Sequence, residues 1–263
     1  MQQDQTPVPQ QTTFPKEITP SIELIKNSIS IYRQAFKKFF GMILIELASI
    51  IIMAVPVVMF VIFNYTFRGK KIIPILNIIF GIILLLALFA VIYISIATKA
   101  GMYLILKKFP PQEKVKEIFK EARKYVWKFF VVGVIVFVVV LLWSLLLIIP
   151  GIIFSVYYTF SGWALIFEGH ENTNALKRSK ELVKGYWWAV VGRFFIFGII
   201  IGIFFLILSA PLLFLSKGTA PYALWQFIKQ PAQFFISPIV VIYSYLIFKE
   251  LVKIKGPSKI LVK

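Results

Sequence analysis

Cysteine is absent from this 263-residue sequence, histidine occurs once, and aspartate and glutamate together number 11. The absence of cysteine excludes disulfide bonds, thiol nucleophiles and cysteine metal sites. A histidine metal site is excluded as well, because His170 stands alone. The sequence contains no glycine-rich phosphate loop and no nucleophile–base–acid set. We therefore expect no catalytic residue, no cofactor and no metal ion, and we predict that the protein is not an enzyme.

Charged residues are scarce at 15% of the chain, whereas hydrophobic residues make up 59% and the mean hydropathy is +0.85. Soluble domains average about 45–50% apolar and about 25% charged residues. Several apolar stretches approach or exceed the roughly 20 residues that cross a bilayer as a helix. The composition therefore excludes a soluble globular domain and predicts an all-α, polytopic membrane helix bundle.

Six apolar segments are predicted to be transmembrane helices. The third and fourth are joined at Pro150-Gly151, which we interpret as a tight turn. The segment 216–233 carries Trp225 among polar residues and is expected to lie at the membrane surface. The predicted crossings are residues 39–64, 73–96 with a continuation to 106, 129–149, 152–167, 187–215 and 234–248.

Three basic amphipathic segments, residues 21–38, 113–128 and 175–186, each precede a crossing. An apolar stripe opposite a basic one is typical of a helix that lies in the membrane interface. We predict three cytoplasmic interfacial helices whose basic side chains contact anionic lipid head groups. The expected lipid contacts are Lys26, Arg33, Lys37, Lys116, Lys120, Arg123, Lys124, Lys180 and Lys184.

The formal net charge is +18, which in a soluble protein would point to nucleic acid. Here the basic residues flank the apolar runs, where they orient the chain, so nucleic acid is not an expected partner. We expect membrane lipids with anionic head groups as partners, and association into a homo-oligomer stays open. One orientation leaves only five of the 29 lysines and arginines outside, and it predicts a multi-pass protein of the plasma (inner) membrane with both termini cytoplasmic. The five are Arg68, Lys70, Lys71, Lys217 and Lys229.

The domain organisation follows from the same pattern. Residues 1–20 are rich in Gln, Thr and Pro and are interpreted as a disordered cytoplasmic tail. Residues 21–255 form the membrane domain, and 256–263 form a basic cytoplasmic tail. The order of amphipathic helix, crossing, turn and crossing occurs three times, which favours a threefold internal repeat. Shared helical periodicity alone is the competing explanation.

Few polar residues fall where they could act inside or beside the bundle. Glu46 lies within the first crossing, where a carboxylate is costly and usually faces the bundle interior or a cavity. Arg193 is a candidate partner for it, although its side chain could instead extend to the cytoplasmic interface. A structural hydrogen bond or a neutral Glu46 are the alternatives to a functional polar site.

A second polar group stands at the end of the fourth crossing. Glu168 and His170 can pair there with Lys177 or Arg178 and so fix the third interfacial helix. A proton relay through His170 is the alternative, since histidine can titrate near neutral pH.

The stretch from Ile148 to Gly192 resembles a known group of membrane proteins. The residues that carry the likeness are Pro150-Gly151, the run ending in Leu165-Ile166-Phe167-Glu168-Gly169, then Ala175-Leu176-Lys177-Arg178-Ser179, Leu182 and Trp187. They resemble the membrane domain of the glycerophosphoryl diester phosphodiesterase family and the YciC-like bacterial integral membrane proteins. With the six-crossing plan, the likeness covers nearly the whole chain. It implies a membrane domain without an established activity, because the phosphodiesterase chemistry belongs to a separate soluble barrel domain.

Composition and resemblance together leave three function classes. We favour a non-enzymatic integral membrane protein that binds anionic lipid and organises or shapes the membrane. The alternative is a transporter or lipid-handling protein with an intramembrane polar cavity near Glu46. A membrane enzyme ranks third, because the sequence lacks a catalytic set.

Overall fold

The computed structural model describes residues 18–67, 73–229, 231–256 and 258, and all regular secondary structure in these residues is helical. The all-α prediction is thus confirmed for these residues, and six helical segments are long and apolar enough to cross a membrane, which is compatible with a multi-pass membrane protein. The elements are α1 Ser21–Gln34, α2 Phe36–Thr66, α3 Ile73–Lys107, α4 Val115–Ala122, the 3-10 helix η1 Arg123–Tyr125, α5 Val126–Leu146, α6 Ile148–Tyr157, α7 Ser161–Glu168, α8 Asn172–Val183, α9 Trp187–Ser209, α10 Pro211–Phe214, α11 Ala220–Lys229 and α12 Ala232–Lys255.

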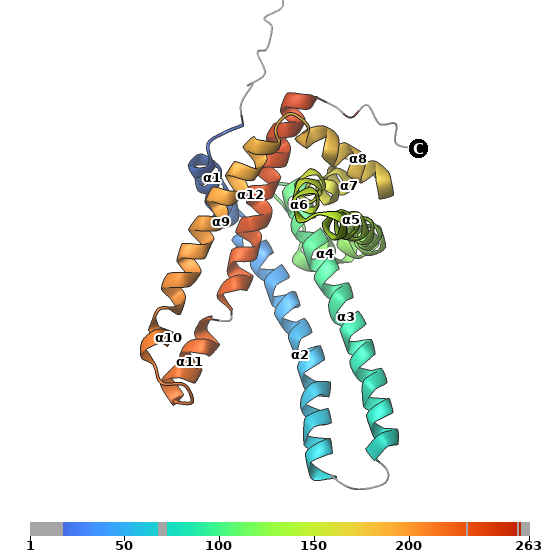
Figure 1. Ribbon diagram of the computed structural model, residues 1–263, viewed down its shortest axis with the longest axis vertical. Coiled ribbons are helices and arrows are strands. Elements are labelled where there is room, and N and C mark those ends of the chain that lie inside the picture. The colour runs from blue at the N-terminus through green and yellow to red at the C-terminus, as the bar shows by residue number, and fades with distance from the viewer. Residues whose placement is uncertain (1–17, 68–72, 230, 257, 259–263) are drawn as a thin grey trace, which may run out of the picture.

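The long helices form three hairpins that diverge from one end of the molecule (Figure 1). Helix α2 packs along α3 and α5 along α6, whereas α9 and α12 meet near that end, where the rings of Phe197 and Tyr243 stack. The α2–α3 hairpin runs down the picture, the hairpin of α9 and α12 diverges to the left, and the α5–α6 hairpin is seen nearly end-on. Short helices α10 and α11 lie at the tip of the α9–α12 hairpin. Away from the end where the hairpins meet, the α2–α3 hairpin and the hairpin of α9 and α12 separate from each other.

The hairpins meet in a region that we call the head, residues 18–43, 100–126, 160–197 and 241–256, which holds the main hydrophobic core. Helix α7 lies at its centre, where the ring of Trp163 stacks on Tyr103 with centroids 3.6 Å apart. The indole Nε1 of Trp163 donates to Ser244 Oγ at 3.0 Å on α12. Both Trp163 and the core residue Phe39 of α2 are fully buried, so the head joins all three hairpins by close packing.

The three predicted amphipathic segments are helical, but two of them bury their apolar side within the protein. Ile118 and Ala122 of α4 are buried where α4 packs against α2 and α3. Leu182 of α8 is buried in the same core. Helix α1 differs, because Ile22 and Ile29 of its predicted apolar side stay 65% and 36% exposed.

The predicted turn at Pro150-Gly151 is wrong by three residues. Helix α5 ends at Leu146, and Leu147 alone is extended, with φ −157° and ψ 139°. Pro150 lies in the first turn of α6, where its missing N–H costs no hydrogen bond. Gly151 serves helix packing instead, since a Cβ there would lie 3.0 Å from the Cα of Ser144 and closer still to its side chain.

Three further boundaries differ from the sequence-based expectations. The fourth crossing is not one helix, because the helix is interrupted between Tyr157 and Ser161, which separates α6 from α7. The expected surface loop 216–233 contains α11, whose Trp225 donates from Nε1 to the carbonyl of Leu208 at 2.8 Å. The expected tail 1–20 is also too long, because Ile18 is buried and Thr19 bonds to Glu250; residues 1–17 lie outside the described part.

Candidate functional site

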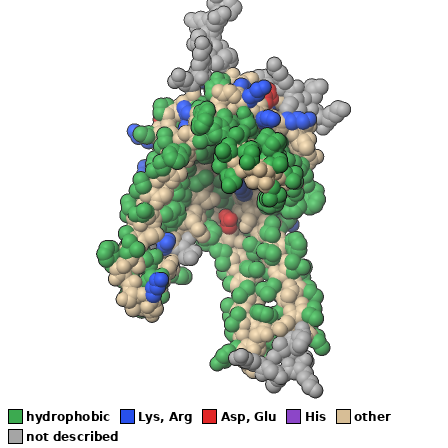
Figure 2. Space-filling model, viewed as in Figure 1, with side chains coloured by type: hydrophobic (Ala, Val, Ile, Leu, Met, Phe, Trp, Pro, Cys, Tyr) green, Lys and Arg blue, Asp and Glu red, His purple; other side chains and the backbone are tan. Residues whose placement is uncertain are grey.

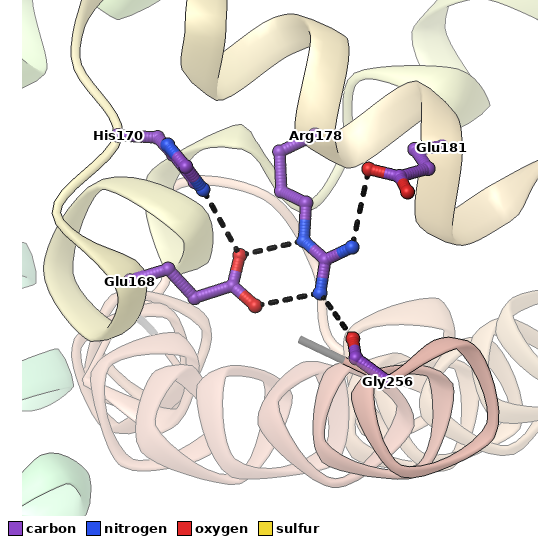
Figure 3. Close-up of polar contacts among 5 residues, drawn as sticks. All are labelled: Glu168, His170, Arg178, Glu181 and Gly256. Atoms are coloured by element: carbon purple, nitrogen blue, oxygen red, sulfur yellow. Dashed lines mark hydrogen bonds and ion pairs between the residues drawn. The ribbon is translucent and has the colours of Figure 1, made fainter. Parts of the chain in front are cut away.

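Arg178 stands at the centre of a buried charged cluster where α7, α8 and the end of α12 meet (Figure 3). Its Nε and Nη2 donate to the two carboxylate oxygens of Glu168 at 2.7 and 2.8 Å. Nη1 reaches Glu181 at 3.2 Å, and Nη2 also donates to the carbonyl of Gly256 at 2.8 Å. One guanidinium thus ties together the fourth candidate span, α8 and the end of α12.

The end of α7 explains why Glu168 faces this cluster. Gly169 takes a left-handed conformation with φ 74°, and the N–H groups of Gly169 and His170 both point to the carbonyl of Ala164. This closure is favoured by glycine, which has no Cβ to clash. It ends the helix and starts α8 within three residues, so that Arg178 returns alongside Glu168.

The electrostatics of the cluster are balanced by its two carboxylates. Burial works against the charged guanidinium, but hydrogen bonds and attraction from Glu168 and Glu181 outweigh it, so the pKa of Arg178 is raised. A two-pronged arginine–carboxylate pair is among the stronger charge-assisted hydrogen bonds. Removal of one partner from such a pair leaves an uncompensated charge, which is the costly case.

His170 lies in the same cluster but makes no hydrogen bond within it. Its side chain is 1% exposed, and Nε2 lies 3.8 Å from Oε2 of Glu168. Within the described residues neither ring nitrogen has a hydrogen-bond partner, so no hydrogen-bonded chain leads away from the imidazole. The structure brings Glu168, His170 and Arg178 together as the sequence suggests. Lys177 is exposed and forms no ion pair with any described residue.

Ser179 makes a contact that the sequence did not reveal. Its Oγ donates to the carbonyl of Tyr157 at 2.6 Å and accepts from the N–H of Phe160 at 3.0 Å. These backbone groups flank the break between α6 and α7, where the helix supplies no partners. Helix α8 therefore completes the interrupted fourth span.

Glu46 is half-buried on α2, and its charged neighbour is Lys99 of α3, which lies close enough to interact electrostatically. The predicted partner, Arg193, makes other contacts. It donates to the backbone carbonyls of Ile18, Thr19 and Ala189, and so holds residues 18 and 19 against α9. Sequence reasoning missed Lys99, although a lone lysine in the apolar run 73–106 was a usable signal.

The nine basic residues predicted to contact lipid are all exposed, and none forms an ion pair with another described residue. Two of them have aromatic neighbours. Arg123 donates from Nε to the hydroxyl of Tyr93 at 3.0 Å, and Lys180 lies 5.5 Å from the ring centre of Phe154. The charges of this set therefore stay available to an anionic partner.

Acidic and histidine side chains do not gather into a group that could hold a metal ion anywhere in the described ranges. Comparison with known families shows a similarity over residues 122–249, which match the model of a domain of unknown function, DUF7847. This region runs from the end of α4 into α12 and includes the Arg178 cluster. No curated protein and no solved structure matches the chain.

Proposed function

We propose that this protein crosses the plasma membrane of a prokaryote six times with both termini cytoplasmic, binds anionic lipid with its head, and organises or shapes the membrane without catalysis. The observation that supports this function is the contrast between an open set of apolar hairpins and a basic head. The three hairpins diverge, and Figure 2 shows the hollow between two of them. A membrane would have to fill that space with lipid.

The charge of the head supports the choice of lipid. The nine exposed and unpaired basic residues come from α1, from the start of α2, from the segment 116–124 and from the α8 region. Each lysine or arginine near an anionic membrane surface contributes about 1 kcal/mol of attraction. Even a fraction of the nine would give a marked preference for a bilayer that carries negative head groups.

The shape supports a mechanical role. Apolar side chains stay exposed along the hairpins, for example Leu86 at 64%, Phe137 at 64% and Leu206 at 71%. Exposed apolar surface of this extent marks contact with lipid or with another apolar surface. Because the α2–α3 and α9–α12 hairpins separate from each other away from the head (Figure 1), the protein is wider at the level of their tips than at the head. Unequal displacement of the two leaflets favours curvature.

Helix α1 is the best-supported of the proposed interfacial helices. Ile22 and Ile29 expose apolar surface at 65% and 36%, next to the basic side chains of Lys26 and Arg33. A basic helix with a free apolar side lies in the head-group region. The order of short helix and hairpin recurs from α1, α4 and α8, in keeping with the proposed threefold repeat.

The test is reconstitution into liposomes with and without phosphatidylglycerol, followed by electron microscopy of vesicle shape. We expect narrow tubes or small vesicles only with the anionic lipid. The triple variant Lys116→Glu, Lys120→Glu and Lys124→Glu should lose the effect, because it reverses the charge of one side of the head. Lys217→Glu with Lys229→Glu, near the tip of the α9–α12 hairpin, is the control and should act like wild type. Unchanged vesicles with the wild-type protein would rule the function out.

A second candidate function is lipid handling or transport, which the Glu46–Lys99 pair favours. These opposite charges lie on two neighbouring apolar helices, where ionisable residues usually mark a pathway. Glu46→Gln should then abolish flux or lipid transfer in proteoliposomes while thermal unfolding stays unchanged. Wild-type transfer by this variant would remove Glu46 from a functional role.

A further inference from the structure

An apolar groove of about 490 Å³ runs between α1, α9 and α12. This volume lies within the roughly 300–1,000 Å³ that is usual for small-molecule sites. The lining is apolar. Its aromatic and aliphatic walls include Ile29, Tyr32, Phe36, Phe197, Phe204 and Phe235.

A basic cleft adjoins this groove on the surface of α1. Lys26, Ser30 and Arg33 line the cleft, and Ile29 belongs to both the cleft and the groove. Both basic side chains are exposed and form no ion pair with a described residue. The basic cleft and the apolar groove are therefore continuous over one turn of α1.

The ring of Tyr32 forms part of the groove wall. Its hydroxyl is buried and has no partner among the described residues. The ring is held in place by Phe36 at 5.5 Å and Phe39 at 5.8 Å between ring centres. Because the hydroxyl is enclosed by the protein, Tyr32 presents its ring and not its hydroxyl group to the groove.

We infer that the groove and the cleft together bind one anionic phospholipid, with an acyl chain in the groove and its phosphate at Lys26 and Arg33. A lipid fits better than a protein partner, because α9 and α12 belong to candidate membrane spans and the charge stands at one end only. The inference rests on the proposed membrane function and adds to it a defined site for one lipid molecule per chain.

The experiment is native mass spectrometry of the full chain released from nanodiscs of equal phosphatidylglycerol and phosphatidylcholine. The wild type should retain one phosphatidylglycerol per chain. Ile200→Trp fills the groove, whereas Ile203→Trp adds the same ring elsewhere on α9; the two isoleucines are 42% and 53% exposed. We expect retention to fall at least about tenfold in the first variant, as for a loss of one order of magnitude in affinity, and to stay unchanged in the second.

The head-group contact has its own matched pair. Arg33→Gln should lower retention about fivefold, the usual effect of one basic residue at a membrane surface. Lys116→Gln on α4 removes the same charge outside the site and should have no effect. Tyr32→Phe, which deletes only the enclosed hydroxyl and keeps the ring in the groove wall, should leave retention unchanged.

Three results would overturn the site: equal retention in Ile200→Trp and Ile203→Trp, equal retention of the two lipids by the wild type, or a protein dimer in place of lipid. Vesicle remodelling by Ile200→Trp separates this site from the proposed function. If the wild type and every variant remodel vesicles but none of them retains phosphatidylglycerol, the site is overturned and the proposed function stands. Retained phosphatidylglycerol without remodelling by the wild type would do the reverse.

Discussion

The head and the outer parts of the hairpins are both rich in hydrophobic residues, but they differ in how much of that apolar surface the chain itself buries. In the head, Phe39, Trp163 and Ile242 are completely buried, and Arg178 is enclosed with its carboxylates. Along the hairpins, by contrast, few residues are buried. In the candidate spans that contain α2, α3 and α9, only 6% of the most hydrophobic 18-residue stretch is buried. The head is stabilised by the chain itself, and the hairpins need a surrounding apolar medium.

This difference separates two sources of stability. Substitutions in the head should lower the stability of the protein in any medium in which it is folded, including detergent micelles. Changes along the hairpins should depend on the medium, because lipid supplies most of their contacts. Four substitutions test that separation, taken from the largest expected effect to the smallest.

Arg178→Ala should destabilise the head most. It removes the shared partner of Glu168 and Glu181 and leaves two carboxylates in the cluster, at a cost of about 3–5 kcal/mol. Thermal unfolding in detergent, followed by circular dichroism, measures the loss. Lys177→Ala is the control, since that side chain is exposed and should change stability by no more than about 0.5 kcal/mol. Equal effects would mean that the cluster does not hold α8.

Ser179→Ala should have the next largest effect. It leaves the carbonyl of Tyr157 and the N–H of Phe160 without the hydroxyl that satisfies both, at a cost of about 1–3 kcal/mol. The same unfolding assay applies. Ser155→Ala removes an exposed hydroxyl that bonds within its own helix, so a comparable loss there would contradict a special role for the break.

Gly151→Ala should act on the hairpin alone. The added methyl group would lie too close to Ser144 and force α5 and α6 apart, at a cost of about 1–3 kcal/mol. Proteolysis of the hairpin in nanodiscs should accelerate, while unfolding of the head stays unchanged. Gly133→Ala meets no atom within 4 Å and should be neutral or slightly stabilising. A fall in head stability with Gly151→Ala would show that the two regions are coupled.

Glu171→Gln should have the smallest effect. Glu171 pairs with Lys128 at 2.5 Å, but both side chains are nearly half exposed, so the pair contributes about 0–1 kcal/mol. Any difference from wild type in the unfolding assay should disappear at high salt. A loss as large as that of Arg178→Ala would mean that burial is not what distinguishes the two ion pairs.

The sequence was sufficient for the parts of this fold that depend on local pattern. Long apolar runs located six helical segments, and the short link after Glu168 placed Arg178 within reach of it. The Glu168–Arg178 pair could be predicted because only ten residues separate the partners.

Long-range contacts could not be read in the same way. The carbonyl of Gly256 and the acceptors of Arg193 lie 78 and about 175 positions away, and no periodicity indicates them. The turn at Leu147 was misplaced because proline fits both a turn and the first turn of a helix. Ser179 was overlooked because its role depends on a helix break that the uniformly apolar sequence conceals.

The apolar tip of the α5–α6 hairpin has a consequence for biosynthesis. Between Lys128 and Glu168 the chain carries no charged residue, and Leu145 to Ile149 form an exposed, wholly apolar end. In the proposed topology the other two hairpins must carry lysines or arginines across the bilayer, each at a cost of about 2.5–3.5 kcal/mol at its centre. The middle hairpin carries no charge between Lys128 and Glu168, so its insertion as a helical pair avoids this cost.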